Sequence, residues 1–296
     1  MKTKILFLTI CYLLLVSCQK NESGIPDIQY SQLYYEYDYT THTAKVIHTP
    51  DGSGSGYSNY SGNIVIPPSV TYYEEQYTVT GIGPGAFAEC ENLLSVKIPS
   101  TIIRIEEAAF SGSPKLESLS IDNGNPIYDS RYNCNAIIET KTNTLLYGCC
   151  RTNIPNNVSI IGEYSFMNLI LERIDIPEGV QRIEHLTLWK LPYLKSIEIP
   201  NSVTYLGENV LSYCNSLESV ILGSGIDTLY YDVLRNNPRL TTVVCKAIYP
   251  PFLNENVFSG IPEDAILYVP DERVHLYLDN EKWRNSFKEI LPISSK

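Results

Sequence analysis

A repeat of apolar residues with a period of 23 constrains the fold of this chain more than any other feature. Residues 81–100 read GIGPGAFAECENLLSVKIPS, and the same order of apolar residues returns at 105–121 in IEEAAFSGSPKLESLSI. Self-similarity with a period of about 20 to 29 residues is typical of stacked-repeat architectures. Four further copies begin at Ile161, Ile183, Leu206 and Leu229.

The repeats contain the pattern L-x-x-V-x-I or close variants of it, whose alternating apolar residues predict a short strand with two inward side chains. Pro99 ends the first such strand because proline has no amide hydrogen to donate. The upstream A-F-x-x-C portion predicts a second buried edge at nearly helical spacing. One repeat buries too few side chains to offset the entropy lost on ordering its backbone, so the repeats are expected to stack.

The inward positions predict nine rungs and a β-rich solenoid. Its short strands are expected to stack in one curved sheet, with an irregular or short helical convex side. The copy before Leu171 is one residue shorter than the others. The rungs are Ile64 and Ile66, Val96 and Ile98, Leu119 and Ile121, Ile154 alone, Ile174 and Ile176, Ile197 and Ile199, Val220 and Leu222, Val243 and Cys245, and Leu267 and Val269.

The segments outside the repeats predict hairpins and caps. Alternating tyrosines near residue 35 predict strands, TYYEEQYTVT predicts a hairpin turning at Glu75-Gln76, and the Gly/Ser run at 51–56 predicts a loop. AIIETKTNTLLYG, within the insert, predicts another hairpin. The predicted divisions are a leader at 1–17, a tether at 18–29, a Tyr-rich β region and cap at 30–80, repeats at 81–270 with an insert near 122–160, and a C-terminal cap at 271–296. The residues expected to seal the last rung are Val274, Tyr277, Leu278, Trp283, Phe287 and Ile290.

The first 17 residues have the layout of an export signal, because Lys2 and Lys4 precede an apolar run that ends at Val16. That run is shorter than the roughly 20 residues of a membrane-spanning helix. It leads into Leu-Val-Ser-Cys18, which resembles the lipobox of bacterial lipoproteins. The resemblance implies cleavage before Cys18 and a lipid on its thiol, whereas the alternative is an ordinary leader cysteine like Cys11.

The chain is acidic, with 33 Asp and Glu against 22 Lys and Arg and a net charge of −11. Two of the lysines lie in the leader. Such a chain repels phosphate backbones and anionic headgroups, so nucleic acid is not an expected partner, and the membrane is expected to be contacted through the lipid anchor only.

Cys90 and Cys214 occupy the same position of the repeat, Cys245 replaces a core isoleucine, and all three are predicted to be buried thiols. Cys134 lies in the insert with the neighbouring pair Cys149 and Cys150. A disulfide from Cys134 to either one is left open, and the absence of a C-x-x-C pair disfavours a zinc site.

No pattern of a catalytic centre is present. The four histidines, His42, His48, His185 and His275, form no metal-hydrolase motif, and neither G-x-S-x-G nor a phosphate loop occurs. We therefore expect no enzyme activity, no cofactor, no metal and no catalytic residue. Asp227-Thr228-Leu229 is similar to the short O-glycosylation sequon of Bacteroidetes, which leaves glycosylation of Thr228 open.

The phrase I-x-x-x-A-F-x-x-C-x-x-L-x-x-V-x-I-P at Ile82–Pro99 resembles the BspA-like leucine-rich repeats of bacterial surface proteins, as does the insert sequence NPIYDSRYNCNAIIETKTNTLLYGC. The resemblance covers about residues 60–296. It implies a leucine-rich-repeat solenoid, and such proteins in Bacteroidetes are often outer-membrane lipoproteins linked to adhesion and host-protein binding. Gln19 after the cysteine is not an aspartate-type retention signal, so transport to the outer membrane is expected. Whether the protein faces the periplasm or the cell exterior is left open. Leu188, Leu211 and Leu234 depart from the family pattern by replacing its phenylalanine.

The outward residues of the strands are the candidate binding face, because solenoids usually bind along such a surface. The position before the first inward residue gives Ser95, Ser118, Arg173, Ser196, Ser219 and Thr242. The position between the inward residues gives Lys97, Ser120, Asp175, Glu198, Ile221 and Val244.

Exposed Ile221 and Val244 would form an apolar contact patch, unless the C-terminal segment covers them. The predicted function is a surface binding or adhesion module for a host or neighbouring-cell protein or a glycan. The alternative is a structural envelope protein without a soluble ligand.

Overall fold

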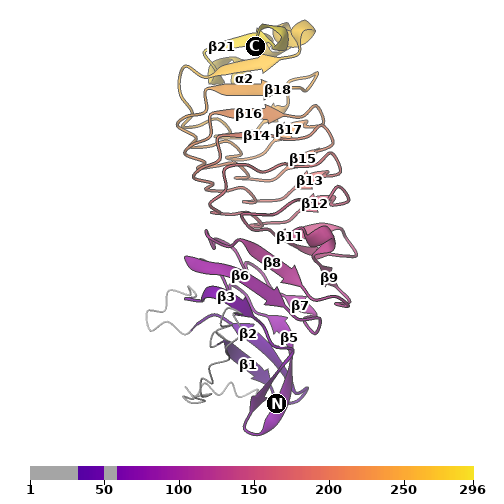
Figure 1. Cartoon of the computed structure of the whole chain (residues 1–296). Coiled ribbons are helices and arrows are strands. Elements are labelled where there is room, and N and C mark those ends of the chain that lie inside the picture. Colours follow the sequence, from indigo (N-terminus) through magenta and orange to yellow (C-terminus); the bar gives the residue numbers. More distant parts are fainter. Residues whose placement is uncertain (1–32, 50–58) are drawn as a thin grey trace, which may run out of the picture.

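A computed structural model describes residues 33–49 and 59–296 of the chain. The described residues form a rod of stacked turns with antiparallel hairpins at its N-terminal end and short helices at its C-terminal end (Figure 1). The predictions for Cys18, for the tether at 18–29 and for the loop at 51–56 lie outside the described residues.

The N-terminal hairpins belong to one sheet in the order β1-β2-β5-β4, and β5 continues from it into the first repeat. The hairpin between β4 and β5 turns at Tyr73 and Glu74, so the prediction of a turn at Glu75-Gln76 was wrong by two residues. Tyr73 and Glu74 have φ values of 46° and 67°, which suit a two-residue hairpin turn. The strands are β1 (Tyr34–Asp38), β2 (Thr43–Ile47), β4 (Ser69–Tyr72) and β5 (Glu75–Ile82).

The L-x-x-V-x-I segments form parallel strands along one side of the rod, which we call the long-strand face. Val96 pairs with Leu119, and Val220 pairs with Val243, so the inward residues stand in files as predicted. These pairings confirm a leucine-rich-repeat solenoid. Its strands are β3 (Ser61–Val65), β6 (Asn92–Ile98), β8 (Ser118–Ile121), β14 (Ser196–Glu198), β16 (Ser219–Leu222), β18 (Thr242–Cys245), β20 (Ile266–Val269) and β21 (Glu289–Pro292).

The expectation of one continuous curved sheet was wrong, because the long-strand face divides into a three-stranded sheet, β3-β6-β8, and a five-stranded sheet, β14-β16-β18-β20-β21. The predicted rungs at Ile154 and at Ile174 and Ile176 form no strand. Between the two sheets lies the insert, in which Tyr128 Oη accepts a hydrogen bond from Ile105 N and Tyr147 Oη accepts one from Ala109 N. Insert side chains thus bind backbone that a regular turn would otherwise cover.

The insert contains the predicted hairpin, whose two strands are antiparallel, with Ile138 paired with Leu145 and Glu139 paired with Thr144. The second hairpin strand then pairs in parallel with the next short strand of the repeats, which returns the chain to the stack. The insert elements are β9 (Tyr128–Asp129), the 3-10 turn η1 (Arg131–Asn133), β10 (Ile137–Glu139) and β11 (Thr144–Tyr147).

A second series of parallel strands, each two residues long, forms the short-strand face. These strands come from the residues around the isoleucine or leucine that begins each repeat, and that residue is buried in all of them except one, where Ile105 is half-buried. They are β7 (Arg104–Ile105), β12 (Ile160–Ile161), β13 (Arg182–Ile183), β15 (Tyr205–Leu206), β17 (Thr228–Leu229) and β19 (Phe252–Leu253).

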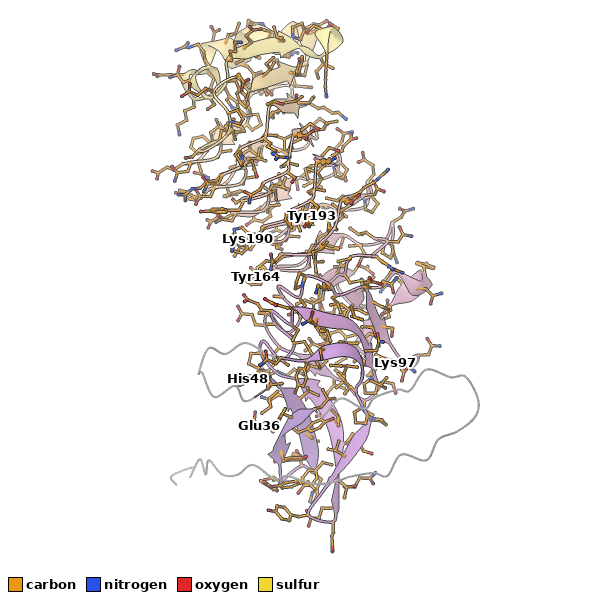
Figure 2. The ribbon with its side chains drawn as sticks, turned by 60° about the vertical axis from the view of Figure 1, so that its left-hand side comes forward. Glu36, His48, Lys97, Tyr164, Lys190 and Tyr193 are labelled. Carbon is orange, nitrogen blue, oxygen red and sulfur yellow. The ribbon has the colours of Figure 1, made fainter. Side chains whose placement is uncertain are left out.

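The third side of each turn, which we call the turn face, contains the A-F-x-x-C segment and has no helix in the described repeats. Two residues on it, four apart, have positive φ in every regular turn. Figure 2 shows Tyr164 and Lys190, which occupy such positions, along one edge of the rod and Lys97 of the long-strand face on the other. The positive-φ pairs are Gly85 and Glu89, Ala108 and Gly112, Tyr164 and Asn168, Leu186 and Lys190, Asn209 and Tyr213, Asp232 and Asn236, and Asn256 and Gly260.

The C-terminal segment seals the interior as expected, with Tyr277 and Trp283 fully buried. The strand β21 adds a final rung that was not predicted, in which Ile290 pairs with Leu267. Leu278 is 41% exposed, so its predicted place in the seal was wrong. The helical elements are η2 (Asp271–Arg273), α1 (Val274–Asp279), α2 (Glu281–Ser286) and η3 (Ile293–Ser295).

The cysteine position of the repeat joins neighbouring turns. Cys90 and Cys214, at this position, are buried thiols, as predicted, and so is Cys245, which takes the place of a core isoleucine in β18. Asn237, which holds the Cys214 position one turn later, accepts a hydrogen bond from Cys214 N at 2.9 Å and donates to Leu211 O at 2.9 Å and to Leu234 O at 2.8 Å. The side chain is fully buried, so these backbone groups have no access to water in its place.

We expect Asn237→Ala to lower the free energy of unfolding by about 2 to 4 kcal/mol, because it leaves one buried donor and two buried acceptors without this partner. Urea unfolding measures the change. The control is Asn215→Ala, at an exposed position of the preceding turn, which should change stability by less than about 0.5 kcal/mol. Equal effects of the two variants would contradict a structural role for the buried amide.

Candidate binding surface

The first predicted column of outward residues stands in register on the long-strand face. Ser196 pairs with Ser219, and Ser219 pairs with Thr242, so three hydroxyls lie side by side on adjacent strands. Within the described part of the chain these three hydroxyls make no hydrogen bond to protein. Ser95 and Ser118, on the three-stranded sheet β3-β6-β8, also pair in register, but their hydroxyls donate to the side chains of Asn63 and Asn135.

Arg173 and Asp175 were predicted to belong to the same face, and they flank the buried Ile174 but lie on no strand. Residues 172–176 form no strand, and the Arg173 guanidinium binds the Asp175 carboxylate at 2.8 Å. Both side chains are more than 70% exposed, so the pair contributes little to stability. The strands that carry the predicted face are therefore divided between two sheets.

The charged members of the second column are each paired. Lys97 Nζ lies 3.0 Å from Asp122 Oδ1, with Ser120, half-buried, on the neighbouring strand. Glu198 Oε1 accepts from Lys246 Nζ at 2.7 Å, across two turns. Charges on this face are thus neutralised locally.

The expected exposed patch of Ile221 and Val244 was wrong for Val244, which is only 4% exposed. Its strand neighbours on the outward side are Ile221 and Tyr268, and Leu291 follows Tyr268 in register. Large side chains on both sides therefore cover Val244. The half-buried Ile221, Tyr268 and Leu291 form an apolar strip that continues onto the last strand.

The short-strand face carries an aromatic cluster that the sequence reasoning missed. The Arg182 guanidinium lies 4.0 Å from the centroid of the Tyr205 ring, and the Tyr230 ring lies 5.2 Å from it on the other neighbouring turn. Gly207 occupies the same position of its turn as Glu184 in the turn before and Tyr230 in the turn after. A Cβ at Gly207 would lie 2.6 Å from the backbone nitrogen of His185, so a larger residue would not fit there without a shift of the backbone. The sequence signal that could have revealed the cluster is the position directly before the isoleucine or leucine that begins each repeat. In successive repeats this position holds Arg182, Tyr205, Thr228 and Phe252.

Hydrogen bonds fix the orientation of this cluster. His185 Nδ1 accepts from Glu208 N at 3.0 Å, so the ring proton lies on Nε2, which is 3.2 Å from Tyr205 Oη. Arg182 Nε donates to Glu184 Oε1 at 2.9 Å. Tyr and Arg are enriched at contact sites, and this cluster presents both in a fixed arrangement.

The cysteines of the insert are free thiols, so the disulfide left open by the sequence is not formed. Cys149 Sγ donates to Glu117 O, and Cys150 Sγ donates to Pro114 O. Burial raises the pKa of the Cys134 and Cys150 thiols to about 11, which keeps both protonated at neutral pH. Thr228 of the sequon is half-buried in β17.

Among the described residues no group of His, Cys, Asp or Glu is arranged to hold a metal ion. No helix over the same residues has the length and apolar character of a membrane span.

A family model described as BspA type leucine rich repeat region matches residues 68–148 and 147–262, with six copies. No curated protein matches the chain. A leucine-rich repeat protein from Bacteroides ovatus is 22% identical over 90% of this chain, with a TM-score of 0.45, and the chain spans 61% of that protein's length.

Two other solved structures are similar to the chain. A leucine-rich repeat protein from Eubacterium ventriosum is 17% identical over 73% of this chain and 77% of its own, with a TM-score of 0.49. The pneumococcal vaccine antigen PcpA is 16% identical over 90% of this chain and 98% of its own, with a TM-score of 0.47.

Because Val244 is buried, a charge there should disrupt folding rather than merely alter the surface. We expect Val244→Asp to lower the free energy of unfolding by about 3 kcal/mol, since it places a carboxylate between apolar neighbours. Ser219→Asp, on the adjacent strand of the same sheet, should cost less than about 1 kcal/mol. Thermal and urea unfolding compare the two, and an unaffected Val244→Asp would show that the position is open to water.

Proposed function

The chain belongs to the BspA type leucine-rich repeat family, and from this we propose that it is a surface-anchored binding module that docks a protein or a glycan on its long-strand face. Leucine-rich repeat proteins of this type are generally protein-interaction or surface modules, and the match indicates no catalytic family. The partner that we propose is a host or neighbouring-cell protein, or a glycan. No catalytic step is part of the proposal.

The observation that carries the proposal is the uninterrupted five-stranded sheet from β14 to β21. Adjacent strands of a sheet lie about 4.8 Å apart, so its outward residues form columns at a fixed spacing. The free hydroxyls of Ser196, Ser219 and Thr242 lie beside the apolar strip of Ile221, Tyr268 and Leu291. A rigid surface that combines both loses little entropy when it binds.

We further propose that the chain is an outer-membrane lipoprotein anchored through Cys18. The support is in the sequence, where Cys18 ends a lipobox-like segment directly after an apolar leader. Each buried lipid methylene contributes about 0.8 kcal/mol, so several acyl chains would hold the protein on the membrane. Exposure on the outside of the cell is part of this proposal.

The alternative is a structural envelope protein, which would associate with its own kind or with the cell wall and bind no soluble ligand. A pulldown with the purified protein distinguishes the two functions. Recovery of the protein alone would favour the structural role.

We expect Ser196→Arg combined with Ser219→Arg to weaken binding at least about tenfold, because two long charged side chains would cover the hydroxyl column. The measurement is binding of the purified chain to an array of extracellular-matrix proteins and glycans, followed by titration of the ligands found. The control is Gln181→Arg with Thr204→Arg, which adds the same charge at exposed positions of the short-strand face. Loss of binding in the control alone would place docking on the other face.

We expect Cys18→Ser to move the protein from the membrane fraction to the soluble fraction and to abolish incorporation of a labelled fatty acid. Cys11→Ser, which changes the other leader cysteine, should leave both unchanged. Fractionation of cells that express each variant, followed by immunoblotting, makes the comparison. Membrane retention of Cys18→Ser without lipid label would contradict the anchor.

A further inference from the structure

The turn face is held together by rows of backbone hydrogen bonds. In five of the seven regular turns, three alternate amides of one turn donate to three alternate carbonyls of the next turn, whereas in the second turn, which faces the insert, the amides of Ala108, Phe110 and Gly112 do not, over the residues that the structure describes. Asp232 N donates to Glu255 O at 3.2 Å, Leu234 N to Val257 O at 3.1 Å, and Asn236 N to Ser259 O at 2.7 Å. The preceding row repeats the arrangement, from the amides of Asn209, Leu211 and Tyr213 to the carbonyls of Tyr231, Val233 and Arg235.

The last turn has the same three amides and no turn after it. They belong to Asn256, Phe258 and Gly260, and Asn256 and Gly260 have the positive φ of their counterparts. Over residues 33–49 and 59–296, none of the three donates a hydrogen bond. The C-terminal cap continues the stack only on the long-strand face, through β21, so the row on the turn face stays open.

A cavity of about 640 Å³ lies beside this open row, between the last turn and the end of α2. Its volume is within the range of about 300 to 1,000 Å³ typical of ligand sites. Phe258, Ile261 and Phe287 give it apolar walls, and Asn254 and Asn285 give it amide groups. The row of the second turn, which faces the insert, has a smaller cavity of about 210 Å³ nearby.

We propose that this C-terminal cavity binds a short peptide segment of another protein. The backbone carbonyls of the segment accept from the amides of Asn256, Phe258 and Gly260, and an apolar side chain of the segment packs against Phe258 and Phe287. The argument for a peptide is that five rows of this kind already bind one, in the form of the next turn of the chain.

The charges around the cavity disfavour an anion such as phosphate. Lys282 and Lys288 are balanced by Glu263 and Glu281. The Lys282 ammonium also donates to Leu253 O at 2.8 Å, so part of its hydrogen-bonding capacity is taken. Neutral carbonyls therefore fit the three amides better than a charged group does.

The cavity is at the C-terminal end of the turn face, away from the hydroxyl column on the long-strand face. The inference therefore goes beyond the proposed function and does not depend on it. Either can fail while the other holds.

Hydrogen exchange at single amides in the purified full chain provides the first test. Without ligand, the amides of Asn256, Phe258 and Gly260 should exchange at least about 100-fold faster than those of Asp232, Leu234 and Asn236, which are bonded in the matched internal row. Equal protection of both sets would show that the last row is already occupied and would overturn the proposal.

A peptide supplies the second test. The probe is an acetylated and amidated copy of residues 253–262, LNENVFSGIP, whose counterpart in the fold provides the carbonyls of the last internal row. The peptide should slow exchange at the three amides at least about tenfold, with saturation at or below about 1 mM. No slowing at 10 times that concentration, or slowing spread over the whole chain, would overturn the proposal.

Variants locate the bound peptide. Asn285→Trp fills the cavity and should abolish the effect, whereas Asn215→Trp, at an exposed position outside the cavity, should retain it. The long-strand double variant of Ser196 and Ser219 should also retain it. Loss in either of the last two variants would overturn the assignment to the cavity, and circular dichroism would confirm that each variant is folded.

Discussion

Hydrogen bonding between successive turns is the constraint on which the rest of this structure depends. Each turn places backbone groups on three sides, and in the regular part of the stack the partners come from the turn before or after it. An unpaired buried amide or carbonyl costs about as much as a lost hydrogen bond. The chain must therefore return to the same height every 23 residues, and the apolar period follows from this requirement.

The same constraint explains why unrelated residues adopt left-handed backbone on the turn face. The first of the two positions holds Gly85, Ala108, Tyr164, Leu186, Asn209, Asp232 and Asn256 in successive regular turns. For residues other than glycine this conformation costs about 1 kcal/mol or more. This backbone directs alternate amides toward the next turn, and in the five turns that are followed by a regular turn those amides gain partners.

The interior could be predicted from the sequence because it depends on spacing alone. Files such as Val96 and Leu119 follow from a fixed period, whatever connects the strands. The break in the sheet could not be predicted, since Ile174 and Ile176 fit the pattern and yet their segment has no strand partner. A pattern reports which side chains can be buried, and a strand also needs a neighbouring backbone at the right height.

The candidate surface was less predictable, because exposure depends on the neighbours in adjacent turns. Val244 occupies an outward position, and the bulk of Ile221 and Tyr268 beside it removes it from solvent. The cluster around Tyr205 was equally hidden from the pattern, since the contacts of the Tyr205 side chain join it to residues 20 to 25 positions away that no inward period marks. To predict the surface of a solenoid, the sequence must first be aligned turn by turn. The residues at the same position of successive turns can then be compared as neighbours.

A stack of this kind also has two chemically different ends. On the turn face the five bonded amide rows all donate to the C-terminal neighbour, so the N-terminal end is left with carbonyls and the C-terminal end with amides. Here β5 and β2 cover one side of the first turn, and β21 covers one side of the last. A cap strand that pairs with the last strand of the long-strand face leaves the amides of the turn face unpaired, because the two faces are formed by different residues of the same turn. The ends of the rod, as well as its sides, are therefore places where the repeat itself determines what can bind.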